Sequence, residues 1–275
     1  MSKTLLITGV SSGFGRALAE AALADGHRVV GTLRNADAAR DFDALRPGRS
    51  FGRVLDVADT AAIAPLVEAV ERDVGAIDAL VNNAGYGHQG TVEETPLAEW
   101  RHQFDVNVFG AVAMIQAVLP YMRKRRSGHI LNITSMGGFI TFPGLGVYHG
   151  SKFALEGISE TLGKEVAALG IRVTAIEPGG FRTHWAGRSL AHAARTIADY
   201  DIVAETSRTR LAERNGRQPG DPAKAARAML EVIAMDTPPA HLLLGSDAVQ
   251  WVHEKLAALT AELRAWEALS LSTDY

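Results

Sequence analysis

The segment LLITGVSSGFGRAL, residues 5–18, joins a short apolar run to the start of a helical pattern through a glycine-rich turn. Glycines in such a turn let the backbone approach a phosphate closely, and the following helix offers unpaired N–H groups at its first turn. This strand–turn–helix context predicts a dinucleotide-binding loop. The loop residues expected to contact the dinucleotide are Gly9, Ser11, Ser12, Gly13, Phe14 and Gly15.

Further along the chain, short β-rich runs alternate with longer helical patterns. Most runs are apolar throughout, which is typical of strands buried on both faces of a sheet. The pattern predicts an α/β fold in which residues 1–275 form a single Rossmann-type domain around a doubly wound, mostly parallel seven-stranded sheet. The expected strands are residues 4–8, 28–33, 53–55, 77–81, 129–134, 172–176 and 241–244.

Two segments interrupt this alternation. Residues 180–218 contain no predicted strand, and a connection of this length is typical of a substrate lid or a helical insertion. Residues 246–275 have the pattern of a C-terminal helical extension, with an apolar stripe from Leu256 to Trp266. We expect this stripe to pack against the core of its own chain, with a contact between subunits as the alternative.

Composition narrows the possible functions. The net charge of −3 gives no reason to expect binding to nucleic acid or to an anionic membrane. The absence of cysteine excludes disulfides, thiolate metal sites and a cysteine nucleophile, and the histidines lack a metal-ligand spacing. There is no signal-peptide pattern and no run of 18 apolar residues, so we expect a cytoplasmic protein without a membrane span.

The end of the second predicted strand bears on the choice of dinucleotide. An acidic residue at this point would bind the ribose 2′-hydroxyl of NAD. This chain has Thr32 and Leu33 there, followed by Arg34, whose guanidinium suits a 2′-phosphate. We therefore expect NADP, with NAD as the less favoured cofactor because Asp37 could still reach a ribose.

Several motifs follow one another in an order that identifies a family. The motifs are TGVSSGFG (8–15), DV (56–57), NNAG (82–85), the asparagine of FDVNVFG (Asn107), the serine of NITSMGG (Ser135), YHGSK (148–152) and PGGFRT (178–183). With these motifs, the sequence resembles a classical short-chain dehydrogenase/reductase over about residues 3–250. TLRN (32–35) and SMGGFITFPGLG (135–146) look most like the steroid- and retinoid-metabolising branch.

The resemblance implies roles for individual residues. Asp56 and Val57 would hold the adenine end of the cofactor. The adenosine ribose would be contacted by Asn82 or Asn83, Ala84 and Gly85. The nicotinamide carboxamide would be positioned by Pro178, Gly179 and Thr183. The catalytic tetrad would be Asn107, Ser135, Tyr148 and Lys152. Relatives of this kind form dimers or tetramers, so we also expect a homo-oligomer.

The chemistry requires an acid or base at the substrate oxygen when a hydride moves to or from the carbon. A free phenol has a pKa near 10, and a nearby positive charge lowers it. Tyr148 and Lys152 are four residues apart and share a helix face, so we expect Lys152 to lower the pKa of Tyr148 and to bind the nicotinamide ribose. Ser135 would hold the substrate oxygen, and Asn107 a water in a proton relay.

The side chains expected to face the nicotinamide are apolar or aromatic. They predict a lipophilic ketone, aldehyde or secondary alcohol as substrate, and an NADP-dependent enzyme would favour carbonyl reduction. The alternatives are a non-catalytic NADP-binding sensor, an NAD-dependent alcohol dehydrogenase of the same fold, and a halohydrin dehalogenase-like lyase. The predicted substrate residues are Tyr86, Phe139, Phe142, Leu145, Phe181 and Trp185.

Overall fold

The computed structural model describes residues 2–183, 185, 187, 189–214 and 216–275. Within these residues, seven strands form one sheet in the order β3-β2-β1-β4-β6-β7-β9, and every neighbouring pair is parallel. This confirms the predicted doubly wound sheet. The strands are β1 (Thr4–Ile7), β2 (Arg28–Leu33), β3 (Ser50–Val54), β4 (Ala79–Asn82), β6 (Gly128–Ile133), β7 (Ile171–Pro178) and β9 (His241–Leu244).

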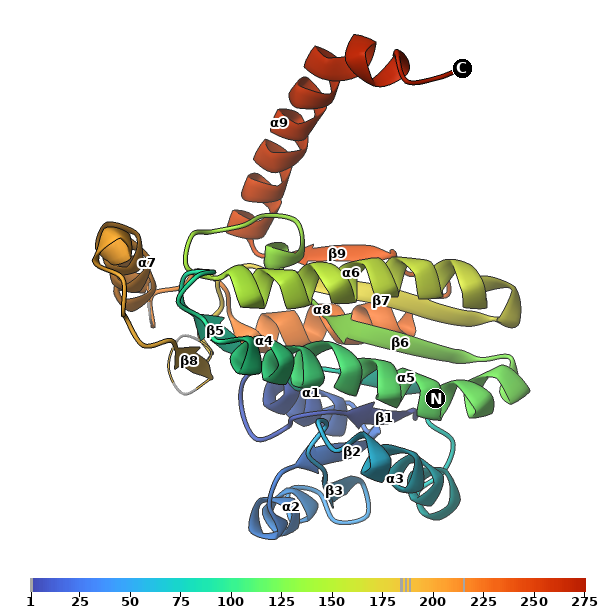
Figure 1. Cartoon of the computed structure of the whole chain (residues 1–275). Coiled ribbons are helices and arrows are strands. Elements are labelled where there is room, and N and C mark those ends of the chain that lie inside the picture. The colour runs from blue at the N-terminus through green and yellow to red at the C-terminus, as the bar shows by residue number, and fades with distance from the viewer. Residues whose placement is uncertain (1, 184, 186, 188, 215) are drawn as a thin grey trace.

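Helices cover both faces of the sheet (Figure 1). Successive side chains of a strand point to opposite faces, so in β1 Leu5 and Ile7 enter one core while Leu6 enters the other. The first core is completed by α1 (Gly13–Ala24), α2 (Ala36–Asp43) and α8 (Pro222–Ala234). The second is completed by α3 (Thr60–Asp73), α5 (Gly110–Arg125) and α6 (Gly146–Val166).

The contact between α1 and α8 joins segments far apart in the sequence. Small side chains line it: Ala19 and Ala22 of α1 lie in the same buried cluster as Ala225 and Ala226 of α8. At the edge of this contact, Arg227 forms an ion pair with Asp25 at 2.7 Å. The N-terminal helix is therefore covered by a helix from the last quarter of the chain.

A long helix crosses the other face of the sheet. It begins as α4 (Leu97–Phe104), passes through the π-helical turn η1 (Asp105–Phe109) and continues as α5. Its residues Leu97–Arg125 are long and apolar enough to cross a membrane, by length and by a mean hydropathy of 1.3. In this fold, Met114 and Val118 are fully buried against the sheet.

The predicted lid, residues 180–218, contains one element that the sequence did not indicate. Strand β8 (Leu190–His192) pairs in parallel with β5 (Gly87–Gln89), so the expectation of no strand in this segment is wrong. Three residues are too few to show a periodic pattern, and the pairing partner lies far away in the sequence. The rest of the segment includes η4 (Ala198–Tyr200) and α7 (Asp201–Arg214).

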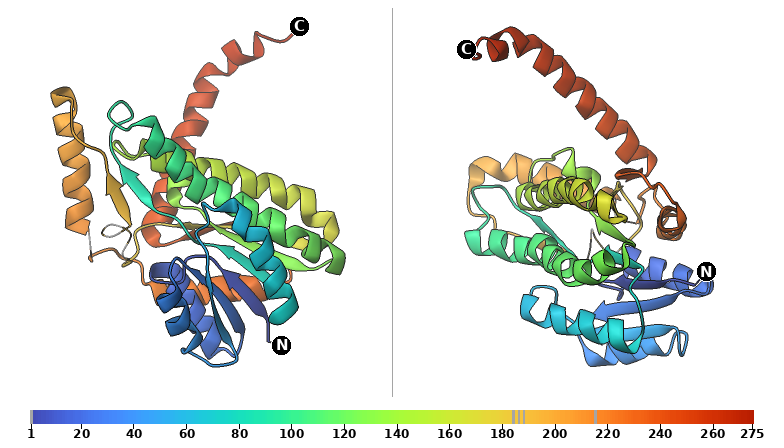
Figure 2. Two further views of the ribbon diagram at one scale, coloured as in Figure 1. Left: turned by 60° about the horizontal axis from the view of Figure 1, so that its bottom comes forward. Right: turned by 90° about the vertical axis from the view of Figure 1, so that its right-hand side faces the viewer.

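The C-terminal extension is helical, as predicted, and forms α9 (Ser246–Leu271). The expected packing of its apolar stripe against the core of the same chain is wrong. Only the base of α9 is buried, at Ala248 and Val252, and every residue from His253 onward is exposed. The cause is the direction of the helix, which leaves the body beyond the sheet edge and projects away from it in all three views (Figures 1 and 2).

Candidate active site

A cavity of about 590 Å³ lies where the carboxyl ends of the parallel strands meet. The strand order reverses between β1 and β4, and ligands of such sheets bind in the crevice at this switch point. Most of the predicted cofactor residues line this cavity. They are Gly9, Ser11, Ser12, Gly13, Phe14, Arg34, Asp56, Val57, Asn83, Ala84, Gly85, Tyr148, Lys152, Pro178, Gly179 and Thr183.

The turn after β1 is fixed to the loop after β4 by four hydrogen bonds. The Thr8 hydroxyl accepts from the backbone N–H groups of Asn83 and Ala84, both at 2.9 Å. The Asn83 amide donates back to the carbonyl oxygens of Thr8 and Gly9, also at 2.9 Å each. Gly9 has a φ of 73°, and a Cβ there would lie 3.1 Å from the Cα of Ala84. The turn therefore holds a shape that requires glycine.

The first turn of α1 opens onto the cavity. Ser12 is its N-cap residue and makes no side-chain capping bond within the described part of the chain, which leaves N–H groups of the first turn available to an anion. Gly15 does not line the cavity, but a Cβ there would lie 2.4 Å from the carbonyl oxygen of Gly9. Gly15 thus lets the helix pack against the turn, and the whole cradle fits a dinucleotide pyrophosphate.

Arg34 stands at the rim of the cavity, directly after β2. It is exposed, and among the described residues it forms no hydrogen bond or ion pair. The neighbouring Asn35 accepts the N–H of Ala38 at 2.8 Å and so caps α2. Asp37, the alternative ribose ligand, is ion-paired with Arg40 on the surface. The guanidinium of Arg34 is the cation best placed for a phosphate at this end.

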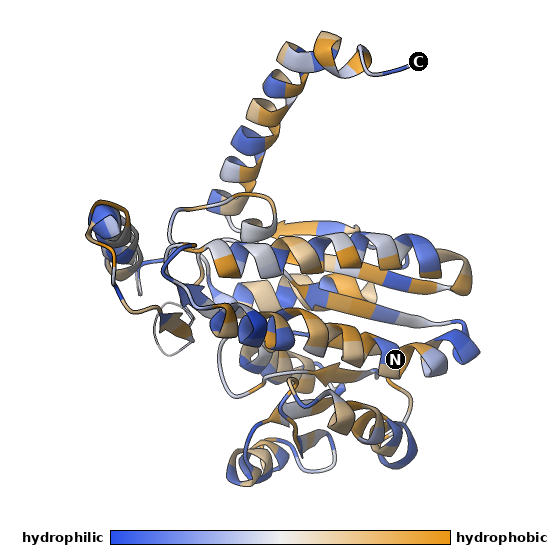
Figure 3. Ribbon diagram, in the orientation of Figure 1, coloured by the Kyte–Doolittle hydropathy of each residue, from blue (hydrophilic) through white to orange (hydrophobic). Residues whose placement is uncertain are grey.

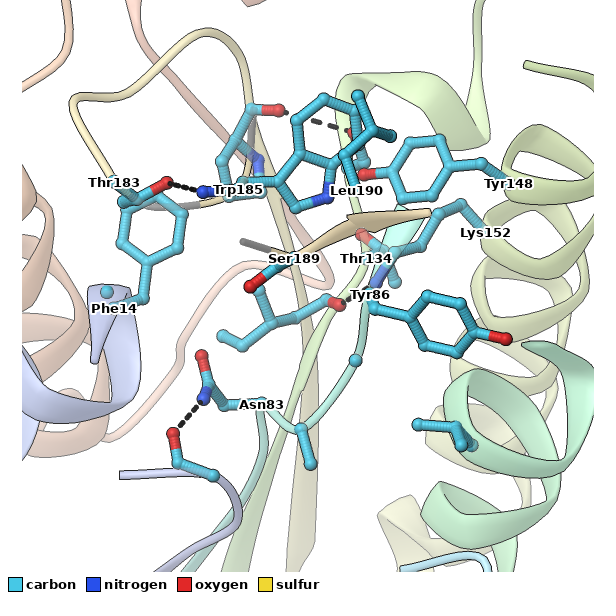
Figure 4. A pocket seen from close by; sticks show the side chains of 18 of the residues that line it. Phe14, Asn83, Tyr86, Thr134, Tyr148, Lys152, Thr183, Trp185, Ser189 and Leu190 are labelled. Carbon is cyan, nitrogen blue, oxygen red and sulfur yellow. Dashed lines mark hydrogen bonds between the residues drawn. The ribbon is translucent and has the colours of Figure 1, made fainter. Parts of the chain in front are cut away.

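Tyr148 and Lys152 enter the opposite wall of the cavity from α6 (Figure 4). The Lys152 Nζ lies 5.8 Å from the centroid of the Tyr148 ring and donates a 2.8 Å hydrogen bond to the carbonyl oxygen of Ile133. Ser135 follows β6, where its hydroxyl accepts the Gly137 N–H at 2.9 Å and bonds to the phenol. Ser135 from the loop after β6 therefore meets Tyr148 and Lys152 from α6 at one wall.

The pKa of Tyr148 differs from the expectation that Lys152 lowers it. Burial raises the pKa of Tyr148 to about 12, although the hydrogen bond from Ser135 acts in the opposite direction. Burial lowers the pKa of Lys152 to about 8, and the carboxylate of Glu156 opposes that change. In the protein by itself, the cost of burying a phenolate therefore dominates, and the phenol carries its proton at neutral pH.

Asn107 lies behind the cavity rather than on its wall. It is buried in the π-helical turn η1, where its amide accepts the Tyr86 N–H at 3.1 Å and donates to the Tyr86 carbonyl oxygen at 3.0 Å. Its Nδ2 also donates to the hydroxyl of Ser151 on α6 at 3.1 Å. Asn107 thus connects the loop after β4 with α6. Asn82 is likewise away from the cavity and donates to the Asn132 side chain at 2.9 Å.

The predicted substrate residues separate into two groups. Tyr86, Phe142, Leu145, Phe181 and Trp185 line the cavity. Trp185 lies beside the phenol, with its ring centroid 5.0 Å from that of Tyr148 (Figure 4). Phe139 does not line the cavity and instead packs edge-on against His241 at 5.8 Å.

Other residues enter the cavity wall without having been predicted. Trp251 comes from the base of α9 and lies edge-on to Phe142 at 5.4 Å, and Leu190 comes from β8. Both depend on how distant segments pack, and no local motif marks them. His149, next to Tyr148 on α6, also lines the cavity. It holds the loop before α6 by accepting the Phe142 N–H at 2.9 Å.

Charged side chains are sparse on this wall. Among the described lining residues, the arginine, lysine and acidic side chains are Arg34, Asp56 and Lys152. Arg34 and Asp56 belong to the end of the cavity near β2 and β3, and Lys152 lies beneath Tyr148. The described wall around Trp185 and Trp251 therefore presents apolar and aromatic surface.

Comparisons with known proteins agree with this geometry. Residues 3–193 match the family model of the short chain dehydrogenases. Oxidoreductase BOA17 of Botryotinia fuckeliana is 36% identical over 275 residues, which are 99% of this chain and 100% of that protein. The 3-ketodihydrosphingosine reductase of Bacteroides thetaiotaomicron is 36% identical over 246 residues, 88% of this chain and 87% of that protein.

Solved structures show the same arrangement. A short-chain dehydrogenase from Streptomyces avermitilis is 42% identical, with a TM-score of 0.93 and full coverage of both chains. An enzyme of Burkholderia phymatum in complex with NAD is 26% identical, with a TM-score of 0.81 over 94% of this chain and 95% of that one. A serine dehydrogenase with NADP+ is 25% identical, with a TM-score of 0.76 over 88% and 94%. The chain therefore belongs to the short-chain dehydrogenase/reductase family of oxidoreductases.

Proposed function

We propose that this protein transfers a hydride between the nicotinamide of NAD(P), with NADPH favoured, and a lipophilic ketone, aldehyde or secondary alcohol, with Tyr148 as general acid/base. One observation carries the proposal. A buried phenol stands between the hydroxyl of Ser135 and the ammonium of Lys152, on a cavity wall opposite a glycine turn suited to pyrophosphate.

The dinucleotide would supply the hydride, and this chain's residues would hold it from one end of the cavity to the other. The first turn of α1 would bind the pyrophosphate, and Pro178, Gly179 and Thr183 would lie at the nicotinamide end. Gly180 donates its N–H to the Asp247 carboxylate at 2.9 Å, which fixes this second loop. Arg34 favours the 2′-phosphate of NADPH, although similar structures hold either dinucleotide.

The proton chemistry favours reduction. A substrate oxygen bound between Ser135 and Tyr148 would accept a proton from the phenol as negative charge develops on that oxygen. The phenol is available as an acid because burial raises the pKa of Tyr148 to about 12. The ammonium of Lys152 would then stabilise the phenolate left behind. Alcohol oxidation would need that phenolate at the outset, which burial disfavours.

The cavity wall supports a lipophilic substrate. Phe142, Trp185, Leu190 and Trp251 surround the space beside the phenol. Among the described lining residues, the only lysine or arginine there is Lys152, which we assign to the phenol and the nicotinamide ribose rather than to a substrate carboxylate or phosphate. One relative is named a 3-ketodihydrosphingosine reductase. We infer a substrate whose carbonyl group is attached to an extended or bulky apolar group.

The test is turnover of NADPH and of NADH across aryl ketones, steroids and long-chain ketones and aldehydes. Tyr148→Phe should lower kcat by about 10²–10⁴-fold, because the proton donor is lost, while the binding of NADPH is retained. Tyr121→Phe on α5, which does not line the cavity, is the matched control and should behave as the wild type.

Three outcomes would contradict the proposal. Wild-type turnover by Tyr148→Phe would remove the tyrosine from the mechanism. NADPH binding without turnover across the panel would favour the sensor. Failure to bind either dinucleotide would favour a lyase that works without one.

A further inference from the structure

Helix α9 continues well beyond the part that its own chain covers. Ala248 and Val252 anchor its base, and from His253 to the C-terminus every residue is exposed. The three views in Figures 1 and 2 show no other described element beside this projecting part. Most of the stability of a helix in a protein comes from packing of its apolar face, so a covering partner would contribute to the stability of this part.

The projecting part carries a regular apolar stripe. Leu256, Leu259, Leu263 and Trp266 are 47%, 40%, 65% and 61% exposed, and they alternate at spacings of three and four residues. The same spacing continues back to Val252. Figure 3 shows hydrophobic and hydrophilic turns alternating along this helix. A repeat of 3.5 residues that is only two positions wide is the signature of a two-stranded coiled coil.

The charges beside the stripe distinguish between possible partners. The exposed part carries Lys255 and Arg264 against three glutamates, so it has no basic face for an anionic membrane. Lys255 and Glu262 are seven residues apart and therefore lie on the same flank of the stripe. Two such helices attract one another when they run antiparallel, because each lysine then meets the glutamate of the other copy.

A parallel pair lacks this complementarity. It would place Glu262 of one copy against Glu267 of the partner subunit, and two like-charged contacts would result. The Lys255 and Glu262 charges therefore favour α9 of a second copy as the partner, and an antiparallel direction for the pair. We propose that α9 binds α9 of a second copy of this chain as a short antiparallel coiled coil, with Leu256 facing Leu259 of the partner subunit at its centre.

The mass of the assembly tests this interface. Leu259→Glu/Leu263→Glu should weaken self-association in sedimentation velocity, so that the assembly dissociates at a higher protein concentration than the wild type does, with NADPH affinity unchanged. Ala258→Glu/Ala261→Glu adds the same charge on the opposite side of the same exposed helix and should keep the wild-type mass. An unchanged concentration dependence of dissociation in the first variant would overturn the proposal, as would sedimentation of the wild type with phosphatidylserine vesicles.

Charge reversal tests the pairing itself. Lys255→Glu or Glu262→Lys alone should weaken the association by roughly threefold to tenfold, because two ion pairs are lost in each case. The double variant should restore the wild-type affinity. Equal weakening in the double variant would exclude the lysine–glutamate contact.

The direction can be read from disulfide crosslinking, because the native chain has no cysteine. An antiparallel pair predicts that Leu256→Cys and Leu259→Cys proteins crosslink efficiently only when they are mixed. Crosslinking of each protein by itself, and none between the two, would show a parallel pair and contradict the proposed direction.

Discussion

Lys152 carries a charge that depends on two opposing effects. Burial lowers its pKa to about 8, and the carboxylate of Glu156, one helical turn further along α6, raises it. Below this pKa the ammonium is present and stabilises the phenolate of Tyr148; above it the charge is lost. The pH–rate profile should therefore fall on its alkaline side at the pKa of Lys152, although Lys152 is not itself the proton donor.

We expect kcat/KM for carbonyl reduction to fall as the pH rises through about 8. Glu156→Gln removes the group that raises the pKa of Lys152, so it should move this limb to lower pH. The measurement is a pH–rate profile at low substrate concentration. Glu165→Gln, on an exposed position of the same helix, is the control and should leave the profile unchanged. A limb at the same pH in Glu156→Gln would contradict this assignment.

Arg34 is the residue on which the cofactor preference depends. Arg34→Ala should raise KM for NADPH by about tenfold or more and leave KM for NADH nearly unchanged, because a charge-assisted bond to the 2′-phosphate is lost. Arg40→Ala, on an exposed arginine of α2 that does not line the cavity, should affect neither cofactor. Equal losses with both cofactors would show that Arg34 does not recognise the phosphate.

Much of the site was predictable from single residues, because the backbone geometry of the turn and of the helix requires particular residue types at particular spacings. The glycines at 9 and 13 have positive φ values, and Tyr148 and Lys152 share a face by their spacing. The pKa of the phenol was not predictable, because it depends on how deeply α6 is buried. The position of Phe139 was not predictable either, since it depends on a contact with His241 in a distant strand.

At the scale of elements, three side chains connect α6, β7 and β9. His241 lies with its Nδ1 2.9 Å from Glu156 and 2.8 Å from Glu177. Burial, together with the facing carboxyl of Glu156, raises the pKa of Glu177 to about 9. The folded protein therefore holds a proton at neutral pH that the unfolded chain releases above about 4.3.

This proton makes stability depend on pH. Because the pKa of Glu177 is raised in the folded state, its contribution to stability is present at low pH and is lost as the pH rises through about 9. The free energy of unfolding in urea should fall between pH 6 and pH 9. Glu177→Gln should reduce this fall, and Glu165→Gln on the surface should not; an equal slope in all three proteins would contradict the argument.

The same measurement should be made in EDTA. The ligand atoms of Glu156, Glu177 and His241 lie within 4.8 Å of one another, so a divalent cation could compete with the proton for them.

The central strands β1, β4, β6 and β7 were recognised because both of their faces are buried and each is a nearly continuous apolar run. The edge strand β3 was expected at residues 53–55 but covers Ser50–Val54, because it is only partly buried and its sequence SFGRV is not an apolar run. Strand β8 lacks this signal because its pairing with β5, rather than its composition, makes it a strand. The apolar stripe of α9 was recognised, but its periodicity carries no information about which surface covers it.

At the scale of the whole molecule, the cavity gathers residues from Gly9 to Trp251. The parallel sheet brings the loops after β1, β4, β6 and β7 to one edge, and this arrangement followed from the sequence. The aromatic wall did not, because β8 and the base of α9 close it from the side. The family was therefore predictable from the sequence, whereas the shape of the space for the substrate could be read only from the complete fold.

The packing of α8 on α1 has a consequence for biosynthesis. Strands β1 and β2 leave the ribosome early, but the helix that covers the apolar side of α1 is made some 200 residues later. Until then, the surface of α1 that α8 covers in the finished fold remains open to water and to other nascent chains. The protein should depend on a holding chaperone for much of its synthesis.

Truncated chains should reveal this dependence. A chain ending at Gly220 lacks α8 together with β9 and α9, and should aggregate or bind a hydrophobic dye strongly. A chain ending at Glu254 keeps all seven strands and α8, and should remain folded and soluble. Native-like solubility and circular dichroism of the shorter chain would show that the residues before α8 fold without this late partner. The order in which this chain is made, and not only the fold it reaches, would then set its yield in the cell.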